Sequence, residues 1–305
     1  MIRTQWLLLI YTAISLNSIF AEEHAKNAPS SLMSRLAIPD STQIQVLETT
    51  DGSTNIGRIV EIGTEEIAFR TDLGIIHIPI SKIKHIETVS ADLIRKGEFW
   101  FPNPNITRLF FAPTARMLKQ GKGYFADYYL FFPGFAYGIT DRFTLGGGLS
   151  IFPTVDINDQ LFFLAPKFGL VQQKTFSFAA GALLVRIPNY EDDASQDDPE
   201  VAGILYGVTT FGQPDASLTA GLGYGFVEGD LADRPMVMIG AEKRLTRRTA
   251  FVTENWIFPG VEDILVSYGI RFFGKRLSVD LGLINTIGEG TIFPGIPYID
   301  FVVQF

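Results

Sequence analysis

Large apolar side chains alternate with small ones in segment after segment through the last two-thirds of the chain. The stretches TFSFAAGALL (175–184), LTAGLGYGF (218–226) and RLSVDLGLI (276–284) all show this pattern. A period of two residues is that of a β-strand. In a soluble sandwich the face opposite the core is charged and hydrated. Here that face carries glycine, serine and isolated charges, and such residues suit the inner wall of a closed barrel.

The length of the apolar runs decides between the two structures that can cross a membrane. The chain has 305 residues, of which 47% are hydrophobic, with 26 Phe and 29 Gly. After the first 21 residues, the longest apolar run is YYLFFPGFAY (128–137), which contains a proline. A membrane helix needs about 18–20 apolar residues. A closed β-barrel is the alternative that satisfies every backbone group in lipid.

The sequence therefore predicts an all-β fold, a membrane-spanning, antiparallel, up-and-down barrel of about 12 strands over residues 99–305. A tilted membrane strand needs about 9–11 residues, and the length of this region fits twelve of them with their connections. The expected strands are 105–118, 123–139, 143–153, 161–172, 176–187, 201–212, 217–227, 235–245, 250–258, 264–273, 277–286 and 296–305.

The connections between these strands alternate in length. Short links are expected at 140–142, 173–175, 213–216, 246–249 and 274–276, and longer ones at 154–160, 189–200, 228–234, 259–263 and 287–295. The link at 119–122 is a short exception among the longer ones. Bacterial outer-membrane barrels have short periplasmic turns and longer outside loops. Aromatic residues gather near the longer loops, as expected at an interface between lipid and water: Phe152, Phe162, Phe163, Tyr190, Trp256, Phe258, Phe293 and Tyr298.

The last segment, YIDFVVQF (298–305), alternates in the same way and finishes on Phe305. It resembles the closing strand of bacterial outer-membrane barrels, which ends in an aromatic residue. The resemblance matches Ile299, Phe301 and Val303 to the lipid-facing positions and adds Tyr298 as an interface ring. It implies that the barrel-assembly machinery reads this strand as a signal, and that outer-membrane lipid surrounds the protein.

The first 41 residues read as export and linker sequence. Arg3, an apolar core and the small residue Ala21 indicate a signal peptide over residues 1–21, with an uncleaved anchor as the alternative. Residues 22–41 are predicted to be a flexible lead-in. The chain has no cysteine, which excludes disulfides and a lipid-modified cysteine.

Residues 42–90 read as a separate small β module. Alternating segments and turn signals at Asp51-Gly52 and Asp72-Leu73-Gly74 predict about five short strands. The pattern resembles an SH3-like or Sm-like barrel. His77 and His85 lie here; a metal site would need a third ligand, so ordinary strand histidines are the interpretation. The module is expected in the periplasm, where it could bind a partner.

The residues do not predict an enzyme, a cofactor or a metal site. All three histidines precede the barrel, and Glu254, a lone carboxylate there, has no partner pattern for acid–base work. Glycines at 146–148 and 221–225 lack phosphate-loop spacing. The net charge of −8 argues against nucleic acid. The acidic loop 191–200 could bind ions or be simply solvated.

Five charged residues are expected to face the lumen: Asp127, Lys167, Arg271, Asp280 and Asp300. In the hairpin SYGIRFFGKRLSVDLG (267–282), a two-residue turn would set Arg271 opposite Asp280, so that the two could pair. Two functions remain open. One is a narrow channel or transport barrel for small solutes, and the other is a non-conducting barrel that anchors the periplasmic module. The oligomeric state stays open.

Overall fold

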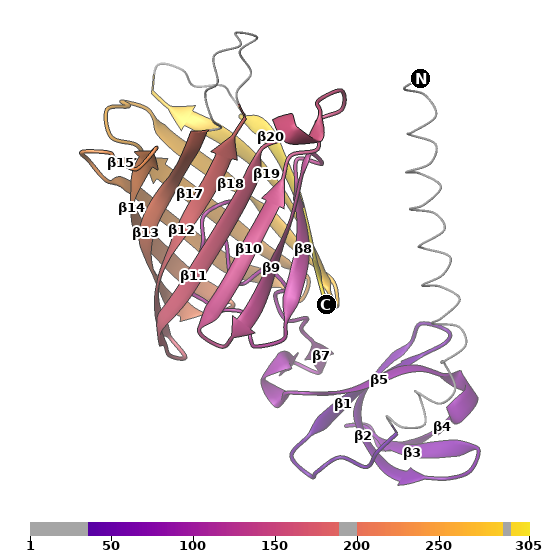
Figure 1. Cartoon of the computed structure of the whole chain (residues 1–305). Coiled ribbons are helices and arrows are strands. Elements are labelled where there is room, and N and C mark those ends of the chain that lie inside the picture. The colour runs from indigo at the N-terminus through magenta and orange to yellow at the C-terminus, as the bar shows by residue number, and fades with distance from the viewer. Residues whose placement is uncertain (1–35, 189–199, 289–293) are drawn as a thin grey trace, which may run out of the picture. The chain divides into compact units, whose positions relative to one another are not determined.

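The computed structural model describes residues 36–188, 200–288 and 294–305, and the chain divides into two compact units, Met1–Trp100 and Phe101–Phe305 (Figure 1). No helix in the described part is long and apolar enough to cross a membrane. The expected signal peptide and most of the acidic loop lie outside the described residues.

The first unit is built around one antiparallel sheet in the order β4-β3-β2-β1-β5. Its elements are β1 (Ile44–Thr49), β2 (Thr54–Ile62), β3 (Glu66–Arg70), β4 (Ile75–Pro79), η1 (Ile80–Lys82) and β5 (Ile83–Val89), followed by η2 (Ala91–Leu93), β6 (Ile94–Arg95) and β7 (Glu98–Phe99). The five strands predicted for this region are present, whereas the SH3-like resemblance stays an expectation.

Alternation supplies this unit with a small core, because every second side chain of a strand points to one face. The buried set is Leu36, Leu47, Ile59, Ile67, Phe69, Ile78, Ile83 and Ile86. At the β1–β2 turn, Gly52 takes a φ of +86° that favours glycine. Hydrogen bonds from the Thr49 hydroxyl and the Ser53 amide lower the pKa of Asp51 to about 2.

The second unit is a closed antiparallel barrel of twelve strands, as predicted. Each strand pairs with its neighbours along the chain, β13 pairs with β14, and β20 pairs with β8 to close the wall (Figure 1). The strands are β8 (Gly123–Tyr128), β9 (Phe132–Thr140), β10 (Phe143–Leu149), β11 (Phe162–Gln172), β12 (Phe176–Ile187), β13 (Glu200–Gln213), β14 (Ala216–Val227), β16 (Met236–Thr246), β17 (Thr249–Ile257), β18 (Ile264–Phe273), β19 (Leu277–Ile287) and β20 (Ile296–Gln304). The short η3 (Ile157–Asp159) and β15 (Asp230–Leu231) lie in connections.

Two of the predicted strand assignments are wrong, and the errors cancel in the count. Residues 105–118 are not a strand of the wall, and the predicted strand 123–139 is two strands, β8 and β9. The break falls at residues 129–131, where Tyr129 and Leu130 both have positive φ. Alternation alone did not show this turn, because the whole stretch is apolar and aromatic.

The connections follow the predicted alternation at most positions. The five short links between the paired strands from β9 to β19 are short turns at one end of the barrel, which is called here the short-turn end. Residues 119–122 are not a loop of the opposite end: Gly121 donates a hydrogen bond to Gly138, and Gly123 pairs with Phe305, so this stretch enters β8 at the short-turn end. The link at the opposite end is residues 129–131.

Large apolar side chains cover the outside of the wall. They include Phe125, Phe135, Phe168, Leu170, Leu205, Leu218, Leu222, Ile239, Phe251, Phe272, Leu281 and Val303, all of which are exposed. A water-soluble monomer rarely exposes a contiguous apolar surface of this extent. An apolar band around a barrel is the surface that lipid requires.

The closing seam between β8 and β20 places the last residue against the first strand. Phe305 N–H donates to the Gly123 carbonyl over 3.0 Å, and its ring centroid lies 5.0 Å from that of Phe125. Ile299, Phe301, Val303 and Phe305 face outward, as predicted from the alternation.

We expect Phe305→Ala to lower the yield of folded barrel, because the ring contact across the seam is lost. The measurement is the heat-sensitive mobility shift of the purified protein on gels. Phe272→Ala is the control, since Phe272 is an exposed outward phenylalanine away from this seam. Equal yields of folded barrel from the two variants would contradict a special role of Phe305 in assembly.

Candidate functional site

Residues 101–122, called here the inner segment, pass through the barrel lumen, where residues 103–118 are mostly buried (Figure 1). Pro102, Pro104 and Pro113 interrupt it, and proline cannot donate to a strand ladder. Only an isolated bridge between Arg108 and Pro113 joins the segment to itself by strand pairing in the described structure. Because it is not in the wall, its backbone groups need partners from the inward-facing side chains.

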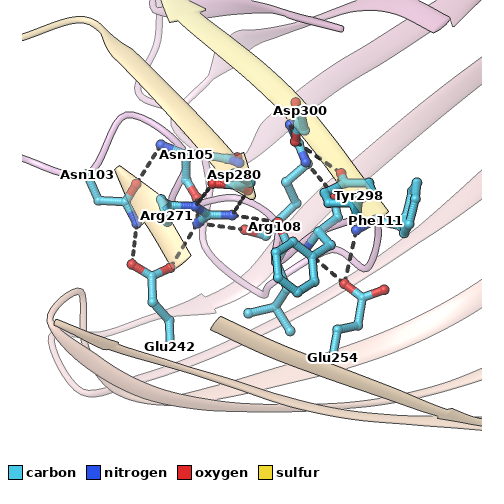
Figure 2. A network of polar contacts seen from close by, with 12 residues as sticks. Asn103, Asn105, Arg108, Phe111, Glu242, Glu254, Arg271, Asp280, Tyr298 and Asp300 are labelled. Atoms are coloured by element: carbon cyan, nitrogen blue, oxygen red, sulfur yellow. Dashed lines mark hydrogen bonds and ion pairs between the residues drawn. The ribbon is translucent and has the colours of Figure 1, made fainter. Parts of the chain in front are cut away.

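Arg271 is the most heavily bonded of these wall residues (Figure 2). It is fully buried, and its Nε and Nη2 each donate to Asp280 carboxylate oxygens over 2.7 Å. Nη1 also donates to Glu242 over 2.9 Å and to the Asn105 carbonyl over 2.8 Å. Nη2 reaches the Leu109 carbonyl as well, over 2.7 Å. Arg271 thus binds the wall and the inner segment together.

The predicted hairpin register is confirmed. Gly274 N–H donates to the Leu277 carbonyl over 2.7 Å, and Arg271 lies directly opposite Asp280. The paired side chains point into the lumen. The bidentate geometry is the strong form of a guanidinium–carboxylate pair.

Glu254 holds the tip of the inner segment by one carboxylate oxygen. Its Oε2 accepts hydrogen bonds from the backbone N–H groups of Phe110, Phe111 and Ala112 over 2.9, 3.0 and 2.9 Å. Its Oε1 accepts from Trp256 Nε1 over 2.7 Å. Three successive amides turned to one anion form a nest that favours negative charge. These donors explain how a carboxylate can be fully buried in the wall.

Lys167 binds backbone carbonyls of the inner segment, whereas Glu254 binds backbone amides. Its ammonium donates to the carbonyls of Thr107, Thr114 and Arg116 over 3.0, 2.9 and 2.9 Å. An ammonium has three protons, so these bonds use all of them. Lys167 therefore ties both limbs of the inner segment to β11.

Arg108 is the buried charged residue that the inner segment itself contributes. Its Nη2 lies 2.5 Å from Asp300, and its guanidinium lies over the Tyr128 ring, 4.5 Å from the centroid. Tyr298 donates to the Phe110 carbonyl over 3.2 Å on the same strand face as Asp300 (Figure 2). The closing strand thus contributes a charge and a phenol to the site.

Glycines on the inner wall make room for the apolar residues of the segment. A Cβ placed on Gly240 would come 2.3 Å from Leu109, and one on Gly169 would come 2.6 Å from Met117. The alternating glycines of the sequence therefore serve in part to accept a chain inside the barrel.

Four of the five predicted lumen charges face inward: Lys167, Arg271, Asp280 and Asp300 are all buried against the inner segment or its partners. Asp127 does not. It shares the face of Phe125, which is 62% exposed on the outer wall, and so the prediction for Asp127 is corrected. Alternation with Phe125 and Phe135, which are both exposed, places Asp127 outside whether or not the strand is broken.

Several predicted interface rings lie inside the barrel. Tyr298, Phe163 and Trp256 share the inward faces of their strands with Asp300, Lys167 and Glu254. Tyr298 is 2% exposed, so it is not a ring at the interface between lipid and water. Tyr190 and Phe293 lie outside the described residues.

Sequence reasoning missed Arg108, Glu242 and the role of Glu254 as an anchor. The available signal was the group of prolines within 102–113, which argues against a wall strand. Among the described residues, no group of three His, Asp or Glu side chains is placed to hold a metal ion. The buried charges bind protein groups and hold the inner segment within the lumen.

No family model and no curated protein matches the chain. Among solved structures, the chain is similar to a KdgM porin in complex with disordered oligogalacturonate, at 10% identity and a TM-score of 0.41, over 60% of this chain and 96% of that one. It is also similar to OmpT of Vibrio cholerae, at 11% identity and a TM-score of 0.32, over 88% of this chain and 100% of that one. Salmonella typhi OmpF in complex with daunomycin matches at 10% identity and a TM-score of 0.33, over 86% of this chain and 96% of that one. The barrel architecture itself follows from the pairing of the strands.

Proposed function

We propose that this chain is an integral outer-membrane barrel that transports small solutes and is closed at rest by its inner segment. The proposal is carried by one observation: the inner segment, and not the side chains of the wall, fills the lumen. Twelve strands enclose a lumen wider than the eight-stranded barrel that side chains can fill. Here many inward wall residues are small, and residues 103–118 occupy the space that they leave.

Two of the cavities beside the inner segment lie within the barrel wall's inner face. One of about 130 Å³ is lined by polar and aromatic groups that include Arg108, Tyr124 and Lys167. The other, of about 300 Å³, lies against Phe111 and Pro113. Such spaces are where a small solute could lie as it passes the inner segment.

The Glu254 nest offers a direct test of closure. We expect Glu254→Gln to raise the frequency of channel openings in planar bilayers, because a neutral amide oxygen is a weaker acceptor for the three amides of the segment. Glu262→Gln is the matched control, since Glu262 lies exposed in the β17–β18 connection. Identical recordings for the two variants would speak against Glu254 as a lock, and silence from every variant would favour the non-conducting anchor.

The short-turn end is proposed to face the periplasm, together with residues 42–90. Short turns mark the periplasmic end of bacterial outer-membrane barrels. We expect a protease added to intact cells to spare the exposed β1–β2 turn, residues 51–53, and to cut there only after the outer membrane is permeabilised. Cleavage at this turn in intact cells would reverse the orientation. The same cells, probed for a known periplasmic protein, supply the control for leakage.

A further inference from the structure

The larger cavity inside the barrel has an unexpected lining. Its wall side is formed mainly by Ile204, Val208, Met236, Met238, Trp256 and Leu265. These residues lie on the inward faces of β13, β16, β17 and β18, because they alternate with exposed outer residues such as Leu205 and Ile239. Phe111 and Pro113 of the inner segment complete it. The lumen of a water-filled porin is polar, so this apolar part of the lumen does not match a path for polar solutes.

We propose that this cavity binds an apolar molecule of about the size of one or two aromatic rings, and that the solute class of the barrel is therefore hydrophobic. The volume is about 300 Å³. An apolar cavity of about 150 Å³ binds benzene, so the space is sufficient for a fused two-ring compound. The hydrophobic lining supplies the affinity.

The side chains that line the cavity also suit a range of apolar shapes. Met236 and Met238 are unbranched and polarizable, and methionine adapts to irregular partners. The indole of Trp256 offers a stacking face, while its N–H stays engaged with Glu254. Because Glu254 also holds residues 110–112, a ligand against Trp256 contacts the same group that anchors the inner segment.

Fluorescence can test the binding directly. Besides Trp6 in the expected signal peptide, the tryptophans are Trp100 and Trp256, so Trp100→Phe isolates the one in the cavity. The mature Trp100→Phe protein in phosphatidylcholine nanodiscs is titrated with 1-naphthylamine, a fused two-ring amine that accepts energy from tryptophan. We expect a saturable transfer at one probe per barrel, above the linear background from probe dissolved in lipid.

A matched pair of filled variants locates the site. Ile204→Phe with Met236→Phe, placed in the Trp100→Phe background, fills the cavity and should weaken the saturable transfer at least tenfold. Leu205→Phe with Val237→Phe adds the same rings to the outer wall and should leave it unchanged. Equal transfer in both variants would overturn the proposal.

Competition decides the matter even if the filled variant does not fold. In the Trp100→Phe protein, 1-methylnaphthalene should displace the probe and naphthalene-1,5-disulfonate should not. Absence of a saturable component, or displacement by the disulfonate alone, would overturn an apolar site. The identification of the solute class rests on the proposed transport function, but binding does not. A barrel that binds the probe yet never conducts would therefore contradict only the transport proposal.

Discussion

Replacing Arg271 with methionine is expected to destabilise the folded barrel by about 3–5 kcal/mol, the cost of removing one partner of a buried ion pair. The substitution leaves Asp280 and Glu242 buried without their shared cation, and it removes the donors to the Asn105 and Leu109 carbonyls. The measurement is the urea midpoint of the heat-sensitive mobility shift, taken on the purified protein in detergent.

Two further variants separate charge from packing. Arg276→Met removes an exposed arginine from the adjacent turn and should leave the midpoint unchanged. Adding Asp280→Asn and Glu242→Gln to Arg271→Met should recover part of the loss, because no uncompensated charge then remains. An Arg271→Met barrel as stable as the parent would show that the cluster does not hold the inner segment.

Replacing residues 103–119 with a glycine–serine sequence of equal length is expected to convert a closed barrel into a steadily conducting one. The flexible sequence keeps the same reach but lacks Arg108 and the apolar residues that pack on Gly240 and Gly169. Water can then solvate Lys167 and Glu254 where they now bind the segment. Single-channel recording in planar bilayers measures the change.

The control for this replacement is the same treatment of residues 259–262 in the β17–β18 connection, all of which are exposed. It should leave conductance as in the parent. Should the barrel without its native inner segment remain silent although it is folded, the wall itself closes the lumen. The anchoring function would then be the better description.

The strands of the wall could be predicted because their pattern depends on residues close together in the sequence. Alternation and turn lengths report which residues face lipid, and the register of β18 and β19 follows from counting back from one short turn. The inner segment could not be predicted in this way. It has the apolar composition of a strand, and its place depends on contacts with residues far along the chain, such as Glu242 and Arg271.

The errors at Asp127 and Tyr298 have another origin, because each residue was assigned by its chemical type. Asp127 was assigned to the lumen as a charged residue, although alternation with Phe125 places it on the outer face. Tyr298 was assigned to the interface by its ring, although alternation with Asp300 places both on the inward face. Glu254 has no acid–base partner in the sequence pattern, and three of its four donors are backbone amides, which leave no pattern in side-chain spacing.

The contacts between the inner segment and β20 also set the order in which the molecule can be assembled. Arg108 meets Asp300, and Gln304 donates to the Pro104 carbonyl across 200 residues of sequence. The interior cannot satisfy its charges until the end of the chain arrives, and such distant contacts make folding slow. We therefore expect the segment to settle in the lumen as β20 joins β8, because its contacts with Asp300 and Gln304 form only when that strand is in place.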